Sequence, residues 1–497
     1  MKKTIIQYFQ WYTPDDAKTW QRLKDDAKRL KDLGYTGVWM PPAYKCLNGV
    51  HDVGYGVYDL YDLGEFDQKG SVPTKYGTKE EYQQALKALH DQDMICISDI
   101  VLNHRMGADE KETVKAVKVN PDNRTEVISQ PEDIDAWTVF NFDGRNGKYS
   151  DFKWNWNCFT GTDYDARKNE NGIYLFEGKQ WDQNVSHENG NFDYIMGADV
   201  DFDNKDVVDE LYRWGKWFEE ETGTDGFRLD AVKSISSKFY SGWLNMMFSN
   251  AEDNFPISVG EYWSGNVDEL LGYLNDSGHC MRLFDVPLHF NLQKAADSNG
   301  SYDIRNVFEN TLADREPWFG VAFVDNHDTQ PTQALESWVM DWFKTSAYAL
   351  VLLNKIQMAC VFLGDVEGIE KTGNEPVPFL EEMVWIRSHL LGDEVVDCND
   401  DDPQKNCWLV AGDHPVVVIL TIGDQKEKDV CFEQYAGKTF VNITDAEDVV
   451  TADDAGSFKM KTPGGGCSIY LLEEDAKALE EAMKSVKIPA ERCLKNE

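Results

Sequence analysis

Eight short apolar segments, several of them separated by stretches with helical spacing, constrain the fold of this chain more than any other feature. Gly34 closes the first helical stretch, and Thr78 with Glu81 forms a capping box that begins the next one. Strands that alternate with helices at this interval form parallel sheets, and eight of them can close into a (β/α)8 barrel. We therefore predict an α/β fold of the TIM-barrel type. The expected strands are residues 4–11, 35–40, 94–101, 226–230, 257–262, 281–286, 321–325 and 356–363.

The alternation breaks in two places, which predicts two further domains. Residues 104–206 are polar and rich in Asp, Asn, Gly and Trp, and a structureless loop of that length is implausible in a compact domain. We expect an inserted, irregular β-rich domain there, after strand three. Beyond residue 395, short apolar runs between turn residues predict a C-terminal antiparallel β-sandwich. The predicted divisions are the barrel at 1–103 and 207–395, the inserted domain at 104–206, the sandwich at 396–475 and a helical tail at 476–497.

The charge of the chain argues against two classes of partner. Its 88 Asp and Glu residues exceed its 49 Lys and Arg residues, which gives a formal net charge of −39. Nucleic acid and anionic membrane surfaces are therefore not expected as partners. No stretch reaches the about 20 apolar residues of a membrane span. A neutral substrate, or metal ions bound by carboxylates, fits this charge, and we expect a monomer.

The first residues and the cysteines together predict a location. Residues 1–11 lack the apolar core and the cleavage site of a secretory signal. The ten cysteines form no CxxC pair, and several lie inside apolar runs, so we interpret them as buried free thiols. Both observations predict a cytoplasmic protein.

One strand carries a charged pair on a single face. Phe227 and Leu229 point to one side of this strand, whereas Arg228 and Asp230 point to the other. Burying these charges is costly unless each satisfies the other. Arg228 is expected to lower the pKa of the Asp230 carboxyl and to keep it ionised, as a nucleophile at carbon must be. A purely structural ion pair is the alternative interpretation.

Further polar residues follow other predicted strands. Glu261 ends the fifth strand, Asp328 follows the seventh, and Asn103 and His104 follow the third. Each alone is compatible with a helix cap or a solvated loop residue. Because the carboxyl ends of all barrel strands open to one face, the residues together predict one catalytic site on that face.

These residues belong to four motifs that resemble those of a known family. Asp99-x-x-x-Asn103-His104, Gly226-x-Arg228-x-Asp230, Glu261 and Phe323-x-x-Asn326-His327-Asp328 resemble the four signature regions of the α-amylase family, glycoside hydrolase family thirteen. The match is close to the liquefying-type bacterial members: residues 52–66 resemble their first long loop, and residues 181–203 resemble their metal-binding segment. The resemblance covers about residues 4–475. It implies endo-hydrolysis of α-1,4-glucosidic bonds in starch, glycogen or maltodextrin, with retention of configuration.

The resemblance also implies catalytic roles. Asp230 would be the nucleophile that forms a covalent glycosyl-enzyme, and Glu261 would act first as general acid and then as base. Retaining enzymes hold two such carboxyls about 5–5.5 Å apart. Asp328 would bind ring hydroxyls and help to stabilise the transition state.

Several other side chains would contact the substrate according to the same resemblance. His104 and His327 would donate hydrogen bonds to sugar hydroxyls, although a lone His is more often a core residue. Tyr55 would stack on that sugar, and Lys233 and Trp263 would lie toward the leaving group. The full set of expected substrate-binding residues is Tyr55, His104, Arg228, Lys233, Trp263, His327 and Gln330.

A calcium site is a further implication of the resemblance. Asn103, Asp193, Asp199 and the backbone carbonyl of Ser234 match the family's calcium ligands. Such an all-oxygen set suits Ca²⁺, which takes six to eight oxygen ligands. A solvated acidic loop is the alternative.

The sequence argues against the second metal cluster that the bacterial relatives contain. Asp182 and Asp201 resemble ligands of a second cluster that holds sodium and calcium. Thr160 stands where that cluster has a bridging Asp, and the loss of this shared carboxylate argues against the extra metals.

Two alternatives to an endo-acting amylase remain open. An exo-acting enzyme that forms one maltooligosaccharide, or a transglycosylase, would carry the same motifs, since loops decide how the cleft is closed. A non-catalytic barrel that binds carbohydrate or protein is more remote. Family members of that kind have lost their catalytic acids, and all three acids are present here.

Overall fold

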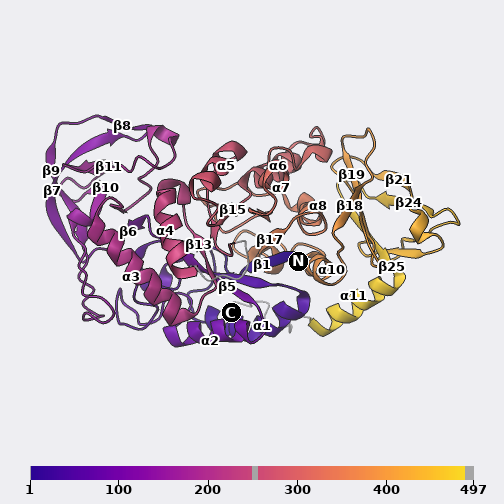
Figure 1. Cartoon of the computed structure of the whole chain (residues 1–497), viewed down its shortest axis with the longest axis horizontal. Coiled ribbons are helices and arrows are strands. Elements are labelled where there is room, and N and C mark those ends of the chain that lie inside the picture. The colour runs from indigo at the N-terminus through magenta and orange to yellow at the C-terminus, as the bar shows by residue number, and fades with distance from the viewer. Residues whose placement is uncertain (1, 249–255, 487–497) are drawn as a thin grey trace.

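The centre of the molecule is a closed barrel of eight parallel strands. A computed structural model describes residues 2–248 and 256–486, and its barrel has the strand order β1-β17-β16-β15-β14-β13-β5-β2 (Figure 1). All eight predicted strands are present, which confirms the TIM barrel. The barrel strands are β1 Lys3–Gln7, β2 Gly37–Met40, β5 Ile95–Ile100, β13 Gly226–Leu229, β14 Val259–Gly260, β15 Arg282–Phe284, β16 Gly320–Phe323 and β17 Met358–Phe362.

Helices connect the barrel strands and surround them (Figure 1). The first helix ends at Gly34, whose φ of 105° glycine adopts without the strain of a side chain. The predicted capping box is present at the second, where Thr78 and Glu81 each accept a hydrogen bond from the other's backbone N–H. The helices are α1 Thr19–Leu33, α2 Lys79–His90, α3 Lys205–Thr222, α4 Ser237–Phe248, α5 Val267–Asp276, α6 Val286–Asp297, α7 Leu312–Arg315, α8 Asp341–Leu352, α9 Leu363–Glu367 and α10 Leu380–His389.

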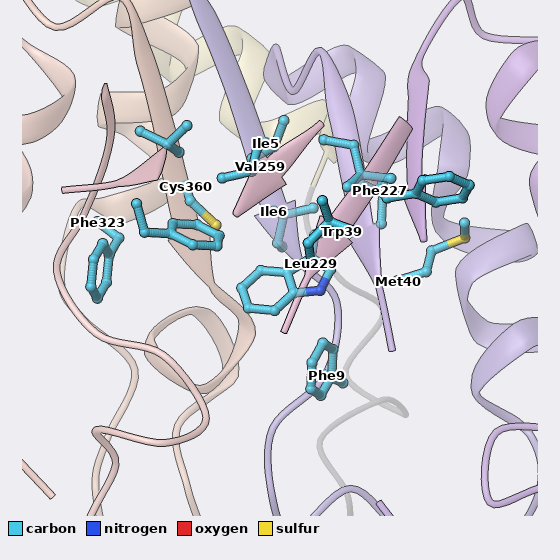
Figure 2. Packing of buried hydrophobic residues seen from close by; sticks show 14 of the residues in the cluster. Ile5, Ile6, Phe9, Trp39, Met40, Phe227, Leu229, Val259, Phe323 and Cys360 are labelled. Carbon is cyan, nitrogen blue, oxygen red and sulfur yellow. The ribbon is translucent and has the colours of Figure 1, made fainter. Parts of the chain in front are cut away.

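Buried hydrophobic side chains from different barrel strands pack into one core (Figure 2). Ile5 and Ile6 of β1, Leu229 of β13 and Val259 of β14 are fully buried, and Trp39 of β2 is 1% exposed. Strands of a parallel sheet are covered on both faces, which explains why they appear in the sequence as continuous apolar runs. This packing fixes the strand ends, where the polar residues begin.

The segment between β5 and α3 forms a seven-stranded sheet with the order β6-β12-β10-β11-β7-β8, and β9 pairs with β7. This antiparallel sheet confirms the inserted β-rich domain. It begins where the barrel strand ends, because β6 pairs His104 with Asp199 of β12. Its strands are β6 His104–Arg105, β7 Glu110–Asn120, β8 Asn123–Val127, β9 Glu132–Val139, β10 Phe159–Asp165, β11 Glu170–Phe176 and β12 Ala198–Val200; a separate pair, β3 Lys45–Cys46 and β4 Val57–Asp59, precedes it.

The C-terminal domain has two antiparallel sheets of unequal size. Six strands form the sheet β18-β19-β20-β25-β22-β23, and β21 pairs with β24. Leu409 and Val417 of the large sheet share a core with Phe458 of the small one, so the predicted antiparallel domain is confirmed. The strands are β18 Glu394–Asp397, β19 Lys405–Ala411, β20 Val416–Thr421, β21 Lys426–Cys431, β22 Thr439–Asn442, β23 Val449–Thr451, β24 Ser457–Thr462 and β25 Cys467–Leu472.

The last described element is α11 Glu473–Val486, a helix on the surface of the C-terminal domain (Figure 1). Residues 487–497 of the predicted helical tail lie outside the described residues. Within residues 2–248 and 256–486, no helix combines the length and the hydropathy needed to cross a bilayer.

Candidate active site

The strand register places the two principal carboxylates on neighbouring strands. Leu229 of β13 pairs with Gly260 of β14, so Asp230 and Glu261 are the next residues on adjacent strands. The Glu261 N–H donates to the Leu229 carbonyl at 2.9 Å, which continues the pairing past the strand ends. Asp328 lies in the loop after β16, at the same carboxyl end of the barrel. The structure thus brings the three predicted acids to one face.

Arg228 joins the carboxylates through one buried guanidinium. Its Nη1 lies 2.6 Å from Asp230 Oδ1 and 3.0 Å from Asp99 Oδ1, and its Nη2 lies 2.9 Å from Glu261 Oε2. The Ala231 N–H donates a further hydrogen bond to Glu261 Oε2 at 3.0 Å. A guanidinium is planar and its nitrogen spacing is fixed, so it holds Asp230 and Glu261 at a short and defined separation.

Burial dominates the charge state of these acids. It raises the pKa of Asp230 above its ordinary value, and Arg228 opposes this rise without cancelling it. Arg228 thus lowers the pKa of Asp230 as predicted, but desolvation of the carboxyl outweighs this effect. Burial likewise raises the pKa of Glu261 against the opposing effect of Arg228, and the Asp230 charge adds to the rise. A carboxyl whose pKa is raised can hold a proton at higher pH.

A ligand can reach all three acids. The side chains of Asp230, Glu261 and Asp328 are 13%, 8% and 24% exposed, whereas Arg228 beneath them is 1% exposed. Burial and the nearby Glu261 charge raise the pKa of Asp328 well above its ordinary value. The arrangement is a pocket of crowded carboxylates above one cation.

Asp99 organises the floor of this site, a role that the sequence did not reveal. Besides Arg228, its carboxylate accepts hydrogen bonds from Trp39 Nε1 at 3.0 Å and from the Tyr55 hydroxyl at 2.9 Å. Asp99 was visible only as the first residue of a motif. Its place in β5, paired with Arg228 of β13, makes it the common partner of three side chains.

In each of the two site histidines one ring nitrogen is held by the protein, and the remaining nitrogen is an acceptor in His104 and a donor in His327. Burial lowers the pKa of His104 to about 4 and lowers that of His327, so both rings are neutral. His104 Nε2 donates to the Tyr55 carbonyl at 2.8 Å, which leaves Nδ1 as an acceptor and not the donor that we expected. The Gln7 amide Nε2 donates to His327 Nδ1 at 2.9 Å, so His327 Nε2 carries the proton and is a donor. This Nε2 lies 3.3 Å from Asp328 Oδ2.

Aromatic rings border the acids on the side of β1. The Tyr55 ring is parallel to His327, with centroids 5.1 Å apart, and to Trp11, with centroids 6.2 Å apart. The Gln330 side chain is fully buried, and its Oε1 accepts from the Trp11 N–H at 3.0 Å. Gln330 therefore fixes Trp11, and its predicted contact with a ligand stays a prediction.

Lys233 and Trp263 lie together, and their predicted place on the leaving-group side stays a prediction. Lys233 Nζ donates to the Trp263 carbonyl at 3.0 Å and forms an ion pair with Glu188 Oε2 at 2.6 Å. Glu188 comes from the inserted domain, so this ion pair ties that domain to the barrel beside the acids. The sequence did not indicate Glu188.

The predicted calcium ligands form a buried acidic group. Asn103 Nδ2 lies 3.3 Å from Asp199 Oδ1 and 3.4 Å from the Asp193 carbonyl. Burial raises the pKa of Asp193 to about 8, and burial together with the Asp193 charge raises that of Asp199. Asp199 Oδ2 has no hydrogen-bond partner among the described residues. Two carboxylates buried side by side need a cation, so these residues fit Ca²⁺. Ser234 is fully buried in the 3-10 helix Val232–Ser234, and the described hydrogen bonds do not connect it with this group.

The predicted ligands of the second metal cluster, Asp182 and Asp201, differ from the calcium group in their partners. Asp182 and Asp201 lie near Asp193, whose pKa their charges help to raise. Lys179 Nζ, however, donates to Asp201 Oδ2 at 2.6 Å, so an ammonium group already neutralises this carboxylate. The Thr160 hydroxyl, in place of a bridging Asp, hydrogen-bonds Asp199.

A groove of about 1100 Å³ adjoins the aromatic residues of the site, although none of the three acids lines it. Trp11, which stacks against Tyr55, and Asn374 are among the residues that line it. This volume exceeds the about 300–1,000 Å³ of most small-molecule pockets, so the groove has room for an extended ligand.

Comparison with known proteins gives consistent matches. The sequence model described as "Alpha amylase, catalytic domain" matches residues 8–376. "Alpha-amylase" of Bacillus licheniformis is 43% identical over 479 residues, which cover 94% of this chain and 93% of the relative. "Glucan 1,4-alpha-maltohexaosidase" of Bacillus sp. (strain 707) is 48% identical over 373 residues, 74% of this chain and 72% of the relative. "Cytoplasmic alpha-amylase" of Escherichia coli (strain K12) is 38% identical over 491 residues, 95% and 99% of the two chains.

Proposed function

Since the chain belongs to the α-amylase family, we propose that its site at the barrel mouth hydrolyses internal α-1,4-glucosidic bonds of starch, glycogen or maltodextrin. The observation that carries the proposal is the single Arg228 guanidinium shared by Asp230 and Glu261. It supports the about 5–5.5 Å carboxyl separation of retaining glycosidases.

The reaction proceeds in two displacements. The Asp230 carboxylate attacks the anomeric carbon while Glu261 gives its proton to the departing glycosidic oxygen, which leaves a glycosyl-enzyme and an ionised Glu261. Glu261 then takes a proton from a water molecule, the resulting oxygen nucleophile attacks the anomeric carbon, and Asp230 departs as a carboxylate. Each displacement inverts the carbon, so the configuration is retained.

The surrounding residues bind and orient the sugar. Asp328 contacts ring hydroxyls, and the His327 Nε2 proton, 3.3 Å from Asp328 Oδ2, orients that carboxylate. Direct contacts of His104 and His327 with the sugar stay predictions, because His104 Nδ1 and His327 Nε2 are buried. Tyr55, held by Asp99, stacks on the sugar face. Arg228 moderates the raised pKa of Asp230, which must be ionised, and burial keeps Glu261 able to hold its proton.

A test separates the two principal acids by leaving group. Glu261→Ala should lower kcat/KM on soluble starch by about 10²–10⁴-fold, the usual contribution of a general acid. The same variant should retain most of its rate of glycosyl-enzyme formation on α-maltosyl fluoride, because fluoride leaves without a proton. Added azide should then replace water and give α-maltosyl azide. Asp230→Ala should be inactive on both substrates.

The controls for this test follow from the geometry. Glu188→Gln, which removes the ion pair of Lys233 but none of the three acids, should keep the leaving-group dependence of the unmodified enzyme. Equal losses of Glu261→Ala on starch and on the fluoride would contradict the acid role.

One relative, the maltohexaosidase that is 48% identical, favours a second mode of action, the release of one oligosaccharide from chain ends. Viscosity of soluble starch and product sizes distinguish the modes. Rapid loss of viscosity with mixed products supports internal cleavage, and a single oligosaccharide from the outset supports release from chain ends.

We propose that Asn103, Asp193, Asp199 and the Ser234 carbonyl bind one Ca²⁺ ion between the inserted domain and the barrel. Asp199 Oδ2, which has no partner within the described part of the chain, and the raised pKa values of both carboxyls support this site. The ion would supply the positive charge that the buried pair lacks and would fix the segment that carries His104. Because Lys179 neutralises Asp201, we propose no further metal at Asp182 and Asp201.

A cytoplasmic location is proposed from two observations. The Escherichia coli relative, 38% identical, is named as cytoplasmic. The cysteines that the structure describes are all unpaired thiols, as proteins of reducing compartments have. A monomer stays our expectation.

A further inference from the structure

Three side chains of different chemistry meet at the end of the barrel opposite the candidate active site. His90 is the last residue of α2, Cys96 is the second residue of β5, and Asp225 directly precedes β13. One ligand atom of each, namely an imidazole nitrogen, the thiol sulfur and a carboxylate oxygen, lies within 4.8 Å of the other two. The barrel strands begin at this end, whereas the three catalytic acids follow the strands at the other end, so the two groups are separate.

Hydrogen bonds of the backbone hold this group in place. The Asp225 N–H donates to the Cys96 carbonyl at 3.0 Å, and the Cys96 N–H donates to Asp225 Oδ2 at 2.7 Å. Cys96 Sγ lies 3.9 Å from the carbonyl of Leu86, which precedes His90 by about one turn of α2. Residues four apart lie on the same side of a helix, so the thiol and the imidazole face each other across the end of α2.

The distances in the group suit a small four-coordinate metal ion. His90 Nε2 lies 3.0 Å from Asp225 Oδ2. Nitrogen and oxygen ligands about 2.1 Å from Zn²⁺ stand about 3.4 Å apart at the tetrahedral angle, and a sulfur ligand at about 2.3 Å stands about 3.6 Å from either of them. The 4.8 Å that encloses the three ligand atoms exceeds this spacing by about 1 Å, so adjustments of the side chains alone allow them to surround one ion.

The chemistry of the three groups selects the kind of ion. Calcium and magnesium prefer ligand sets made of oxygen alone, whereas thiolate and imidazole ligands suit Zn²⁺. The hydrogen bond from the Cys96 N–H orients the Asp225 carboxylate, as outer hydrogen bonds do for metal ligands. Cys96 is fully buried, but the side chains of His90 and Asp225 are 38% and 33% exposed. An ion can therefore enter from solvent between these two side chains and keep a water molecule as its fourth ligand.

We propose that His90, Cys96 and Asp225 bind one Zn²⁺ ion, with water as the fourth ligand. The ion replaces the proton of the thiol, and this proton passes to solvent. The bound ion links α2 to β5 and to the start of β13, which are neighbouring strands of the barrel. Its effect is therefore to stabilise the fold, and it takes no part in the reaction at the other end of the barrel. The proposal does not depend on the proposed function.

The test uses Co²⁺ as a coloured probe for the zinc site. The full chain is treated with a chelator and then saturated with Ca²⁺, so that sites made of oxygen ligands are filled. One equivalent of Co²⁺ should then give a thiolate-to-cobalt charge-transfer band in the near ultraviolet, and Zn²⁺ should displace the Co²⁺ and remove the band. Cys96→Ala should lose this band. In competition with a zinc-binding dye, His90→Ala should bind Zn²⁺ at least about 100-fold more weakly than the unmodified enzyme.

His51→Ala is the matched control. His51 Nδ1 lies 2.8 Å from Asp15 Oδ2, an exposed pair like that of His90 and Asp225, but within the described part of the chain no cysteine completes it. This control should leave both the band and the affinity for Zn²⁺ unchanged.

Thermal unfolding gives a second and independent measurement. Zn²⁺ should raise the Tm of the unmodified enzyme by a few degrees and leave that of His90→Ala unchanged. His90 is on the surface, so this variant tests the site even if Cys96→Ala folds poorly. The proposal is overturned if the unmodified enzyme gives no charge-transfer band, if the band persists in Cys96→Ala and so comes from another thiol, or if Zn²⁺ leaves the Tm of the unmodified enzyme unchanged.

Discussion

Removal of the shared cation is the most informative perturbation of the candidate site. In Arg228→Gln, Asp230 and Glu261 lose the positive charge that opposes the rise of their pKa values. The substitution keeps a polar side chain on the strand but leaves three carboxylates, including Asp99, without their common partner. We expect both pKa values to increase further, so both limbs of the pH profile of kcat/KM move to higher pH.

The size of the shift follows from the distances. Nη1 lies 2.6 Å from Asp230 Oδ1 and Nη2 lies 2.9 Å from Glu261 Oε2. Two unit charges about 4 Å apart, centre to centre, interact by about 4 kcal/mol at an effective dielectric constant of about 20, which corresponds to roughly 3 pKa units. Asp230 is 13% exposed, and solvent reduces this value, so we expect a shift of about 1–2 units.

The assay is kcat/KM on 4-nitrophenyl maltoheptaoside as a function of pH. Asp230 must be ionised, so the acid limb reports its pKa in the free enzyme. Arg282→Gln is the matched control: Arg282 is a barrel-strand arginine, 6% exposed, that binds the Pro256 carbonyl. This control should lose stability but keep both limbs in place. An Arg228→Gln enzyme with lower activity and an unmoved acid limb would refute the electrostatic role of Arg228.

Three further predictions concern stability and the binding residues. Gly34→Ala should lower the free energy of unfolding by at least about 2 kcal/mol, because an alanine is strained at a φ of 105°. Gly272→Ala, at an exposed position of a helix, should raise the free energy of unfolding by about 0.5–1 kcal/mol. Denaturant titration measures both values. Calcium should raise the Tm of the unmodified enzyme, and Asp199→Asn should abolish this effect. In chelator the variant should have a higher Tm than the unmodified enzyme, because it removes one of two repelling buried charges. A Tm that calcium leaves unchanged in the unmodified enzyme contradicts the site. Gln7→Leu should lower kcat by roughly tenfold, because the proton of His327 is no longer fixed on Nε2, and steady-state kinetics that match the unmodified enzyme would count against that tautomer.

Much of the fold was predictable because the barrel strands are buried on both faces and appear as apolar runs. The same argument explains why some strands of the C-terminal domain give no such signal in the sequence. β18 and β23 are exposed or half-exposed edge strands whose residues, such as Glu394 and Thr451, give no apolar run. The small second sheet gives no apolar run either, because β24 alternates buried and exposed residues over six positions. A local sequence pattern indicates a strand through the apolar side chains that the strand buries, and these strands bury few of them.

The positions of the acids followed from barrel geometry, but their protonation and hydrogen bonds did not. Arg228 and Asp230 are two residues apart, so the sequence shows that they meet; it does not show how deeply, and depth decides the net pKa. The tautomer of His327 is set by Gln7, which lies 320 positions away in the chain. A motif therefore specifies which side chains gather at the strand ends, whereas contacts between distant strands decide which of them donate, which accept and which hold a proton. The reaction of a glycosidase depends on which side chains donate, accept or hold a proton. Variants of Gln7 and Asp99, outside the three acids, should therefore alter the reaction without altering the fold.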